Sequence, residues 1–229
     1  MHPLLDGLTF IKAKLVRQHS REFTGALDVY SLPNDMQIYA SAKFLKLVCV
    51  ALTVSDNKQL RENAPSKPLS VVAPWELRSR SGRRFLHSTL DVAHVKLSCS
   101  WINLHRTRLT REAFEELVSS IHTHSEDGGS LFVICVDGDI ARQFARAHQI
   151  YINRDNEMLM GYHKQRIDNL TIQEISAAAE QAGFVLRSCT QGDSLLQSHG
   201  INAAPYDLWT SQTFFLMHFQ SRLHFLKPS

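Results

Sequence analysis

The chain has 229 residues, of which 44% are hydrophobic and 21% charged, and its formal net charge is +3. This length and apolar content are enough for one buried core, so the sequence predicts a single domain over 1–229 and excludes disordered, collagen-like and disulfide-stapled classes. The longest apolar runs, 45–54 and 131–136, are far shorter than the ~20 residues of a membrane-spanning helix, so no membrane is expected as a partner. Ten glycines make up about 4% of the chain, against a usual ~7%.

The cysteines and the N-terminus bear on the compartment. Four scattered cysteines show no CxxC spacing, and three of them lie in apolar, strand-like runs, which favours a reducing, intracellular setting such as the nucleus or cytoplasm. Residues 1–20 carry three lysines and arginines and one acid on an apolar background. This composition leaves a mitochondrial presequence open beside the alternative of a structural helix.

Helical and strand patterns alternate along the chain. Apolar spacing of three and four residues predicts helices at 3–19, 36–44, 55–63, 110–122, 140–147 and 172–181. Apolar runs predict strands at 23–30, 45–54, 69–73, 95–102, 131–136, 184–188 and 213–219. Residues 78–84 are predicted as a basic loop. Gly128 and Gly129 are predicted to stop the helix that begins at residue 110. The alternation indicates a parallel, doubly wound, Rossmann-like α/β sheet of seven strands.

The stretch 95–136 carries the most specific pattern. A strand ends in W-I-N-L-H at 101–105, a helix follows, and Gly128-Gly129 precede the strand L-F-V-I at 131–134. This order resembles the S-adenosylmethionine-dependent methyltransferase fold. Within that class it looks most like the mRNA cap guanine-N7 methyltransferases, whose fourth strand ends in Q-F-x-x-H. Trp101 stands in place of the Gln, and His105 matches the His.

Other segments follow the same order. K-L-V-C-V-A at 46–51 resembles the family's second strand, K-L-V-C-x-D, and L-D-V-Y-S-L-P-N-D at 27–35 falls where the family has L-D-L-G-C-G-x-G-G-D. W-T-S at 209–211, leading into 213–219, looks like the closing strand. The resemblance spans nearly the whole chain and depends on the ordered set rather than on any one motif.

The departures from this family fall at the cofactor. The resemblance places the degenerate cofactor positions at Asp28, Tyr30, Leu32, Ala51 and Trp75. The family's glycines let backbone approach the ligand, whereas residues 30–33 here contain no glycine and include a proline without an amide donor. The family's acid for the ribose hydroxyls is replaced by an alanine, and two unpaired hydroxyls would cost about 1–3 kcal/mol each. We therefore expect no cofactor and no catalytic residues.

Two of these positions have their own alternatives. Asp28 keeps the family's first acid, but capping of a strand end is the preferred explanation for it. Trp75 falls where the family has an acidic cluster that contacts adenine, so its side chain is expected to fill the adenine space.

The positions that correspond to the family's cap-binding site depart less from the family's residues than the cofactor positions do. The resemblance assigns guanine binding to His105, Asp168 and one of Phe214 or Phe215, because an acid can accept from the base edge and an aromatic ring can stack on its face. Arg106 replaces the family's Tyr. Ordinary packing is the alternative for the histidine and both phenylalanines, since one of two adjacent strand residues faces the core.

Basic residues offer a second candidate surface. Phosphate contact is considered for Arg106 and for the group Arg78, Arg80, Arg83 and Arg84, with simple solvation as the alternative. The twelve histidines include His122 and His124, but these have no Cys or carboxylate partner at ligand spacing, so no metal is expected.

These patterns predict a pseudoenzyme: a degenerate cap guanine-N7 methyltransferase-like protein acting as a non-catalytic RNA- or cap-binding or regulatory subunit. Its expected partners are a protein of a capping or ribonucleoprotein complex and RNA. An active S-adenosylmethionine-dependent RNA methyltransferase with an unusual cofactor loop is the alternative. A scaffold that has lost both pockets is the third.

Overall fold

A seven-stranded sheet forms the centre of the molecule. The computed structural model describes residues 3–64, 68–73, 76–160, 163–166, 169–202 and 212–222. The strands are β1 (Gly25–Val29), β2 (Lys46–Val50), β3 (Leu69–Val72), β4 (Leu97–Asn103), β5 (Ser125–Val136), β8 (Phe184–Gln191) and β9 (Phe214–Ser221). Their spatial order is β3-β2-β1-β4-β5-β9-β8, and a separate hairpin joins β6 (Glu157–Met160) to β7 (His163–Arg166).

The sheet is mixed, so the prediction of an entirely parallel sheet is wrong at one strand. β1 to β5 pair in parallel, whereas β9 runs antiparallel to both β5 and β8. Gln191 at the end of β8 lies opposite Phe215 at the start of β9, so the chain leaves and re-enters the sheet at the same edge. A parallel strand would have needed a crossover back to the opposite edge.

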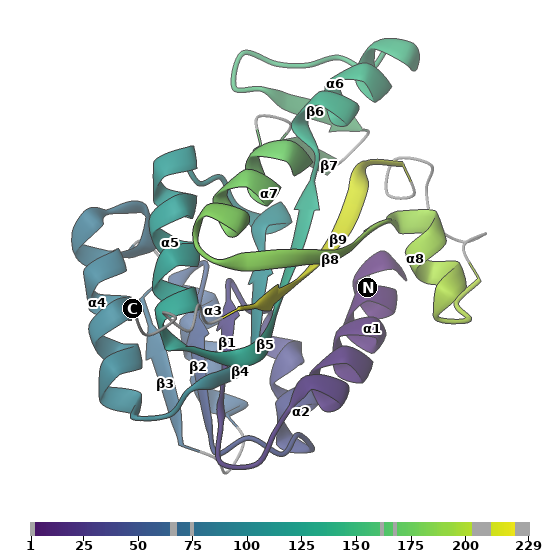
Figure 1. The fold of residues 1–229 in the computed structure, drawn as a ribbon. Helices are drawn as coiled ribbons and strands as arrows, with labels where there is room; N and C mark the ends of the chain where they lie inside the picture. The colour runs from purple at the N-terminus through teal and green to yellow at the C-terminus, as the bar shows by residue number, and fades with distance from the viewer. Residues whose placement is uncertain are drawn as a thin grey trace, which may run out of the picture.

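Helices cover both faces of the sheet (Figure 1). They are α1 (Pro3–His19), α2 (Met36–Ala40), α3 (Val54–Glu62), α4 (Arg80–Ala93), α5 (Arg111–His124), α6 (Gly138–Ala147), α7 (Ile172–Gln181) and α8 (Gly192–Ser198). One apolar cluster packs α4, α5 and α7 on one face, and a second packs α1, α2, α3, α6 and α8 on the other. This is a doubly wound arrangement, as the sequence predicts. Among the described residues, no helix is long and apolar enough to cross a membrane.

Two local predictions are wrong. Arg80, Arg83 and Arg84 lie on the first turns of α4 rather than in a loop, because Ser79 caps that helix by accepting a hydrogen bond from the Gly82 amide at 3.0 Å. Gly128 and Gly129 do not stop α5, which ends at His124, but lie inside β5 where its register with β4 shifts. A β-bulge with φ of +72° at Gly128 explains the residue type there.

Asp137 joins the starts of two helices at the carboxyl end of β5. Its Oδ1 accepts from the amides of Asp139 and Ile140 at 3.0 and 2.8 Å, so it caps α6. Its Oδ2 accepts from the amide of Ile172 at 2.8 Å, at the start of α7. One buried carboxylate therefore fixes both helices relative to the sheet.

The start of α7 carries a complete capping box, which provides a test of the local structure. The Thr171 hydroxyl accepts from the Glu174 amide at 3.2 Å, and the Glu174 carboxylate accepts from the Thr171 amide at 2.8 Å. We expect Thr171→Ala to lower the free energy of unfolding by about 1 kcal/mol in urea titrations. Glu174→Gln preserves an acceptor and should cost less; equal stability of all three proteins would contradict the assignment.

Candidate functional site: the closed crevice between β1 and β4

The strand order reverses direction between β1 and β4, and in open α/β sheets ligands bind beyond the carboxyl ends of the strands at such a point. Three segments meet there. Residues 30–32 follow β1, Ala51 follows β2, and the short 3-10 helix Leu104–Arg106 follows β4. This is where the sequence places the degenerate cofactor positions.

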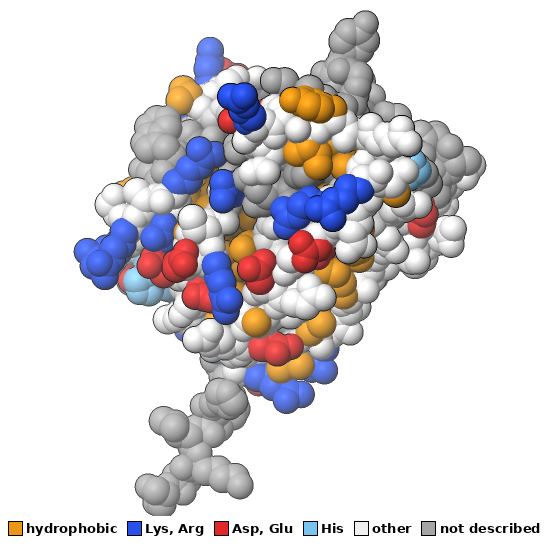
Figure 2. Space-filling model, turned by 90° about the horizontal axis from the view of Figure 1, so that it is seen from above, with side chains coloured by type: hydrophobic (Ala, Val, Ile, Leu, Met, Phe, Trp, Pro, Cys, Tyr) orange, Lys and Arg blue, Asp and Glu red, His pale blue; other side chains and the backbone are white. Residues whose placement is uncertain are grey.

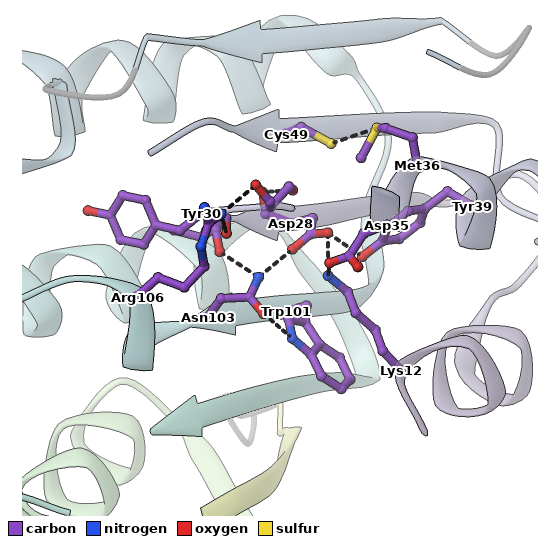
Figure 3. Close-up of polar contacts among 12 residues, drawn as sticks. Lys12, Asp28, Tyr30, Asp35, Met36, Tyr39, Cys49, Trp101, Asn103 and Arg106 are labelled. Carbon is purple, nitrogen blue, oxygen red and sulfur yellow. Dashed lines mark hydrogen bonds and ion pairs between the residues drawn. The ribbon is translucent and has the colours of Figure 1, made fainter. Parts of the chain in front are cut away.

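A buried ionic cluster occupies this junction (Figure 3). The ammonium of Lys12, on α1, lies 2.6 Å from a carboxylate oxygen of Asp28 and 2.6 Å from one of Asp35. The Tyr39 hydroxyl donates to the same Asp28 oxygen at 2.8 Å. All four side chains are buried, so α1, β1 and α2 are joined by charges that have no contact with bulk water.

The second carboxylate oxygen of Asp28 is also used. Asn103 is the last residue of β4, and its side-chain amide donates to this oxygen at 3.0 Å and to the Val29 carbonyl at 3.1 Å. The indole of Trp101 donates to the Asn103 side-chain oxygen at 2.9 Å, and the Lys12 ammonium lies 5.3 Å from the centroid of the Trp101 ring. Asp28 is therefore saturated by the protein itself and does more than cap a strand end.

Burial and charge shift the pKa values of this cluster. Burial acts to lower the pKa of Lys12, but the carboxylates of Asp28 and Asp35 outweigh it, and the net pKa lies above its ordinary value. The pKa of Asp28 is raised, chiefly by burial. The ammonium is thus held charged between two carboxyl groups across the physiological range.

Tyr30 follows β1, at the position that the resemblance assigns to the cofactor loop, but its side chain turns away from the crevice. It adopts a left-handed φ of 59°, the conformation that glycine favours, and its fully buried ring packs in the apolar cluster under α4 and α5. Burial raises the pKa of its hydroxyl to about 12. Tyr30 therefore points away from the Asp28 cluster, as Figure 3 shows, and Lys12 rather than Tyr30 lies against Asp28.

Arg106 ties the segments after β1 and β4 together. Its guanidinium donates to the carbonyls of Tyr30 and Ser31, both at 2.7 Å, and pairs with Asp56 on α3 at 3.1 Å. Three interactions of a mostly buried guanidinium hold the segment after β1 in place. Arg106 is thus part of the internal structure and does not extend toward a phosphate.

The space left beside the cluster is small. A cavity of about 10 Å³, close to the room that one water molecule needs, is lined by Leu32, His105 and residues of the Lys12 cluster. Ala51 is fully buried, so the missing acid is matched by a packed methyl group. Trp75 and Asp168 lie outside the described residues.

Of the aromatic candidates for cap binding, both phenylalanines are buried and His105 is half-buried. His105 packs against Phe214 with ring centroids 5.6 Å apart, and Phe214 and Phe215 are 7% and 8% exposed. Within the described part of the chain neither ring nitrogen of His105 reaches a partner with hydrogen-bond geometry. Burial lowers the pKa of His105 to about 3, with the charge of Arg106 adding to the effect, while the nearby Ile134 backbone acts weakly the other way. His105 is therefore neutral, and its two ring nitrogens are shielded from solvent although the residue as a whole is only half-buried.

The remaining arginines differ in their exposure and in their contacts with neighbouring residues. Arg83 pairs with Glu116 at 2.6 Å and donates to the Leu77 carbonyl, and Arg78 donates to the Thr107 hydroxyl at 3.2 Å. Arg80 and Arg84 are exposed on α4. These two offer the more accessible cationic heads of the predicted basic group.

A hollow of about 640 Å³ lies between the starts of α5 and α7, and its lining mixes both charges. Arg111 pairs with Glu115 at 2.8 Å, and Arg142 pairs with Asp139 at 2.9 Å. Figure 2 likewise shows basic and acidic side chains interspersed over the face seen from above. No continuous positive surface is visible on that face among the residues described.

Sequence reasoning missed the residues that fill the crevice. Lys12, Tyr39 and Asn103 all contact Asp28, yet none was singled out. One signal was available: Lys12 lies on the same face of its helix as Leu8, Leu15 and the adjacent Ile11, and a lysine on an apolar face indicates a buried partner of opposite charge. Nothing in the sequence identified that partner as Asp28.

Comparisons with known proteins agree on the fold. No protein-family model matches the chain, and no curated protein matches it. Among solved structures, a methyltransferase from Clostridium acetobutylicum ATCC 824 superposes with a TM-score of 0.59 at 8% identity, over 95% of this chain and 92% of that one. The chain has the fold of the S-adenosylmethionine-dependent methyltransferases.

Other solved methyltransferases superpose over similar lengths. The N-methyltransferase NodS from Bradyrhizobium japonicum WM9 has a TM-score of 0.57 at 7% identity, covering 96% of this chain and 98% of its own. A complex of the Haloferax volcanii Trm112 methyltransferase activator with a methyltransferase gives a TM-score of 0.55 at 10% identity, over 94% of this chain and 90% of that one. At these identities the likeness concerns the methyltransferase fold alone.

The described residues do not fit the cofactor that this fold usually holds. A ligand of that size needs a pocket of about 300 Å³ or more. The crevice between β1 and β4 instead holds the Lys12 cluster, and the segment after β1 is fixed by Arg106.

Proposed function

We propose that the protein is a methyltransferase-fold subunit that does not bind S-adenosylmethionine and acts without catalysis in an RNA-processing or ribonucleoprotein assembly. The observation that carries the proposal is the Lys12 cluster, which saturates Asp28 at the point where ligands enter a sheet of this order. The order of sequence motifs supports descent from a cap guanine-N7 methyltransferase. In such a protein the fold would serve to present a surface that binds RNA or a protein partner.

Calorimetric titration with S-adenosylmethionine tests the loss of the cofactor. We expect no saturable heat, because binding requires breaking two buried ion pairs and releasing the segment after β1. A methyl-transfer assay with radiolabelled cofactor and capped RNA should give only background counts. Low-micromolar binding, or transfer that Asp28→Asn abolishes, would establish the active enzyme instead.

RNA contact is proposed for the exposed arginines of α4. Among the described residues, Arg83 is held by an ion pair with Glu116 whereas Arg80 and Arg84 are exposed, and counterion release makes such contacts salt-dependent. In fluorescence anisotropy with labelled RNA, Arg80→Glu with Arg84→Glu should weaken binding and reduce the salt slope by about 1 per arginine.

A matched double variant, Arg146→Glu with Arg154→Glu, reverses two exposed charges elsewhere and should bind RNA as the unmodified protein does. Equal affinities for capped and uncapped RNA are expected because both ring nitrogens of His105 are shielded from solvent. If both double variants behave alike, the basic turn of α4 is not the contact surface, and a protein partner becomes the remaining role. The complex of a fold neighbour with an activator protein supports a partner of that kind.

A further inference from the structure

Three potential metal ligands from two helices meet on the face of the sheet opposite the Lys12 cluster. His87 and Asp91 lie one turn apart on α4, and His124 is the last residue of α5. Their ligand atoms all lie within 4.8 Å of one another. His124 Nε2 lies 2.8 Å from Asp91 Oδ1, and His87 Nε2 lies 4.0 Å from Asp91 Oδ2.

The surroundings of the two imidazoles orient them as ligands. His124 Nδ1 lies 2.8 Å from the Ser120 carbonyl oxygen, which can only accept, so Nδ1 carries a hydrogen. Without an ion, Nε2 donates to the Asp91 carboxylate, and a bound metal would take the place of that hydrogen on the Nε2 lone pair. His87 Nδ1 lies 3.4 Å from the Ser120 hydroxyl, which leaves its Nε2 facing Asp91 as well. Metal-bound histidines commonly donate their other nitrogen to a backbone carbonyl in this way.

One ligand is fixed and two can adjust. The His124 side chain is 9% exposed, whereas those of His87 and Asp91 are 47% and 60% exposed. A zinc ion needs nitrogen and oxygen ligands at about 2.0–2.2 Å, so small rotations of the two exposed side chains suffice to close the site. A hollow of about 270 Å³ opens beside His87 and Ser120, with Arg83, Arg84 and Glu116 also in its lining.

We propose that His87, Asp91 and His124 form a zinc-binding site that clamps α4 to α5. Two imidazoles and one carboxylate suit zinc, with water in the fourth position, and suit magnesium or calcium poorly because those ions prefer oxygen ligands. The partners of His124 come from α4, more than thirty residues earlier, which is why neighbouring sequence offers no metal motif. The proposal is independent of RNA binding and of the proposed function.

Titration of the tag-free, chelator-treated protein with zinc chloride tests the site. We expect one equivalent to bind, to raise the melting temperature, and to be replaceable by cobalt with visible absorption bands typical of nitrogen and oxygen ligands. Magnesium chloride should produce neither effect. Absence of stoichiometric zinc binding would overturn the proposal.

Variants locate the ion. Asp91→Asn and His87→Ala change exposed side chains, so both variants should preserve the circular dichroism spectrum. Each should weaken zinc binding at least tenfold. His124→Ala should weaken zinc binding by at least as much. His148→Ala removes an exposed histidine at the end of α6 and should leave binding unchanged. Unaltered affinity in Asp91→Asn and His87→Ala would place any bound zinc elsewhere among the twelve histidines and contradict the site.

Discussion

Replacing Lys12 by methionine is expected to lower the free energy of unfolding by about 3–5 kcal/mol, the largest effect of any single change considered. The substitution keeps most of the side-chain volume but leaves the carboxylates of Asp28 and Asp35 buried without their cation. Uncompensated buried charge is the reason for so large a cost. Chemical denaturation monitored by circular dichroism measures it.

Lys14→Met is the matched control, because Lys14 lies on the exposed side of the same helix, where loss of a surface charge changes stability by no more than about 0.5 kcal/mol. Combining Lys12→Met with Asp28→Asn and Asp35→Asn removes the whole set of charges and should recover a large part of the loss. A cost below about 1 kcal/mol for Lys12→Met would show that the cluster contributes little to the fold. It would also remove the main argument for a crevice closed by the protein itself.

Alternating apolar patterns made most of this fold predictable. The long helix Arg111–His124 and the central strand over 131–136 have strong periodicity and clear caps, and both form as expected. The error at α4 has a physical origin: four arginines in seven residues resemble a solvated loop, although arginine is a good helix former and Leu86 and Leu90 supply the buried stripe.

The candidate site was less predictable because it depends on contacts between distant segments. Ala51 and the missing glycines predicted the loss of a ligand pocket, but they did not identify the side chains that lie there in the structure. Lys12 reaches Asp28 across 16 residues, and Asn103 reaches it across 75. Sequence order alone does not give such contacts: the pairing of β1 with β4 brings Asn103 beside Asp28, and the packing of α1 on the sheet brings Lys12 there.

His105 supplies the second large expected effect, a loss of stability in acid. In the unfolded chain its imidazole takes up a proton as the pH falls through its ordinary pKa of 6.5, whereas in the folded protein burial holds the pKa at about 3. Between these values only the unfolded state gains the proton, so stability is complete above pH 6.5 and is lost as the pH falls toward 3. By pH 5 the loss from this one group is about 2 kcal/mol.

His105→Leu removes the group that must stay neutral and unpartnered. Between pH 7 and pH 5 the free energy of unfolding of the variant should therefore fall by about 2 kcal/mol less than that of the unmodified protein. Urea unfolding at each pH measures it. His218, whose pKa burial lowers to about 4, gives both proteins the same additional acid sensitivity and cancels in the comparison. His148→Leu, at an exposed position, should track the unmodified protein. Parallel pH profiles for His105→Leu and the unmodified protein would mean that His105 meets solvent, and would restore it as a candidate ligand for a base.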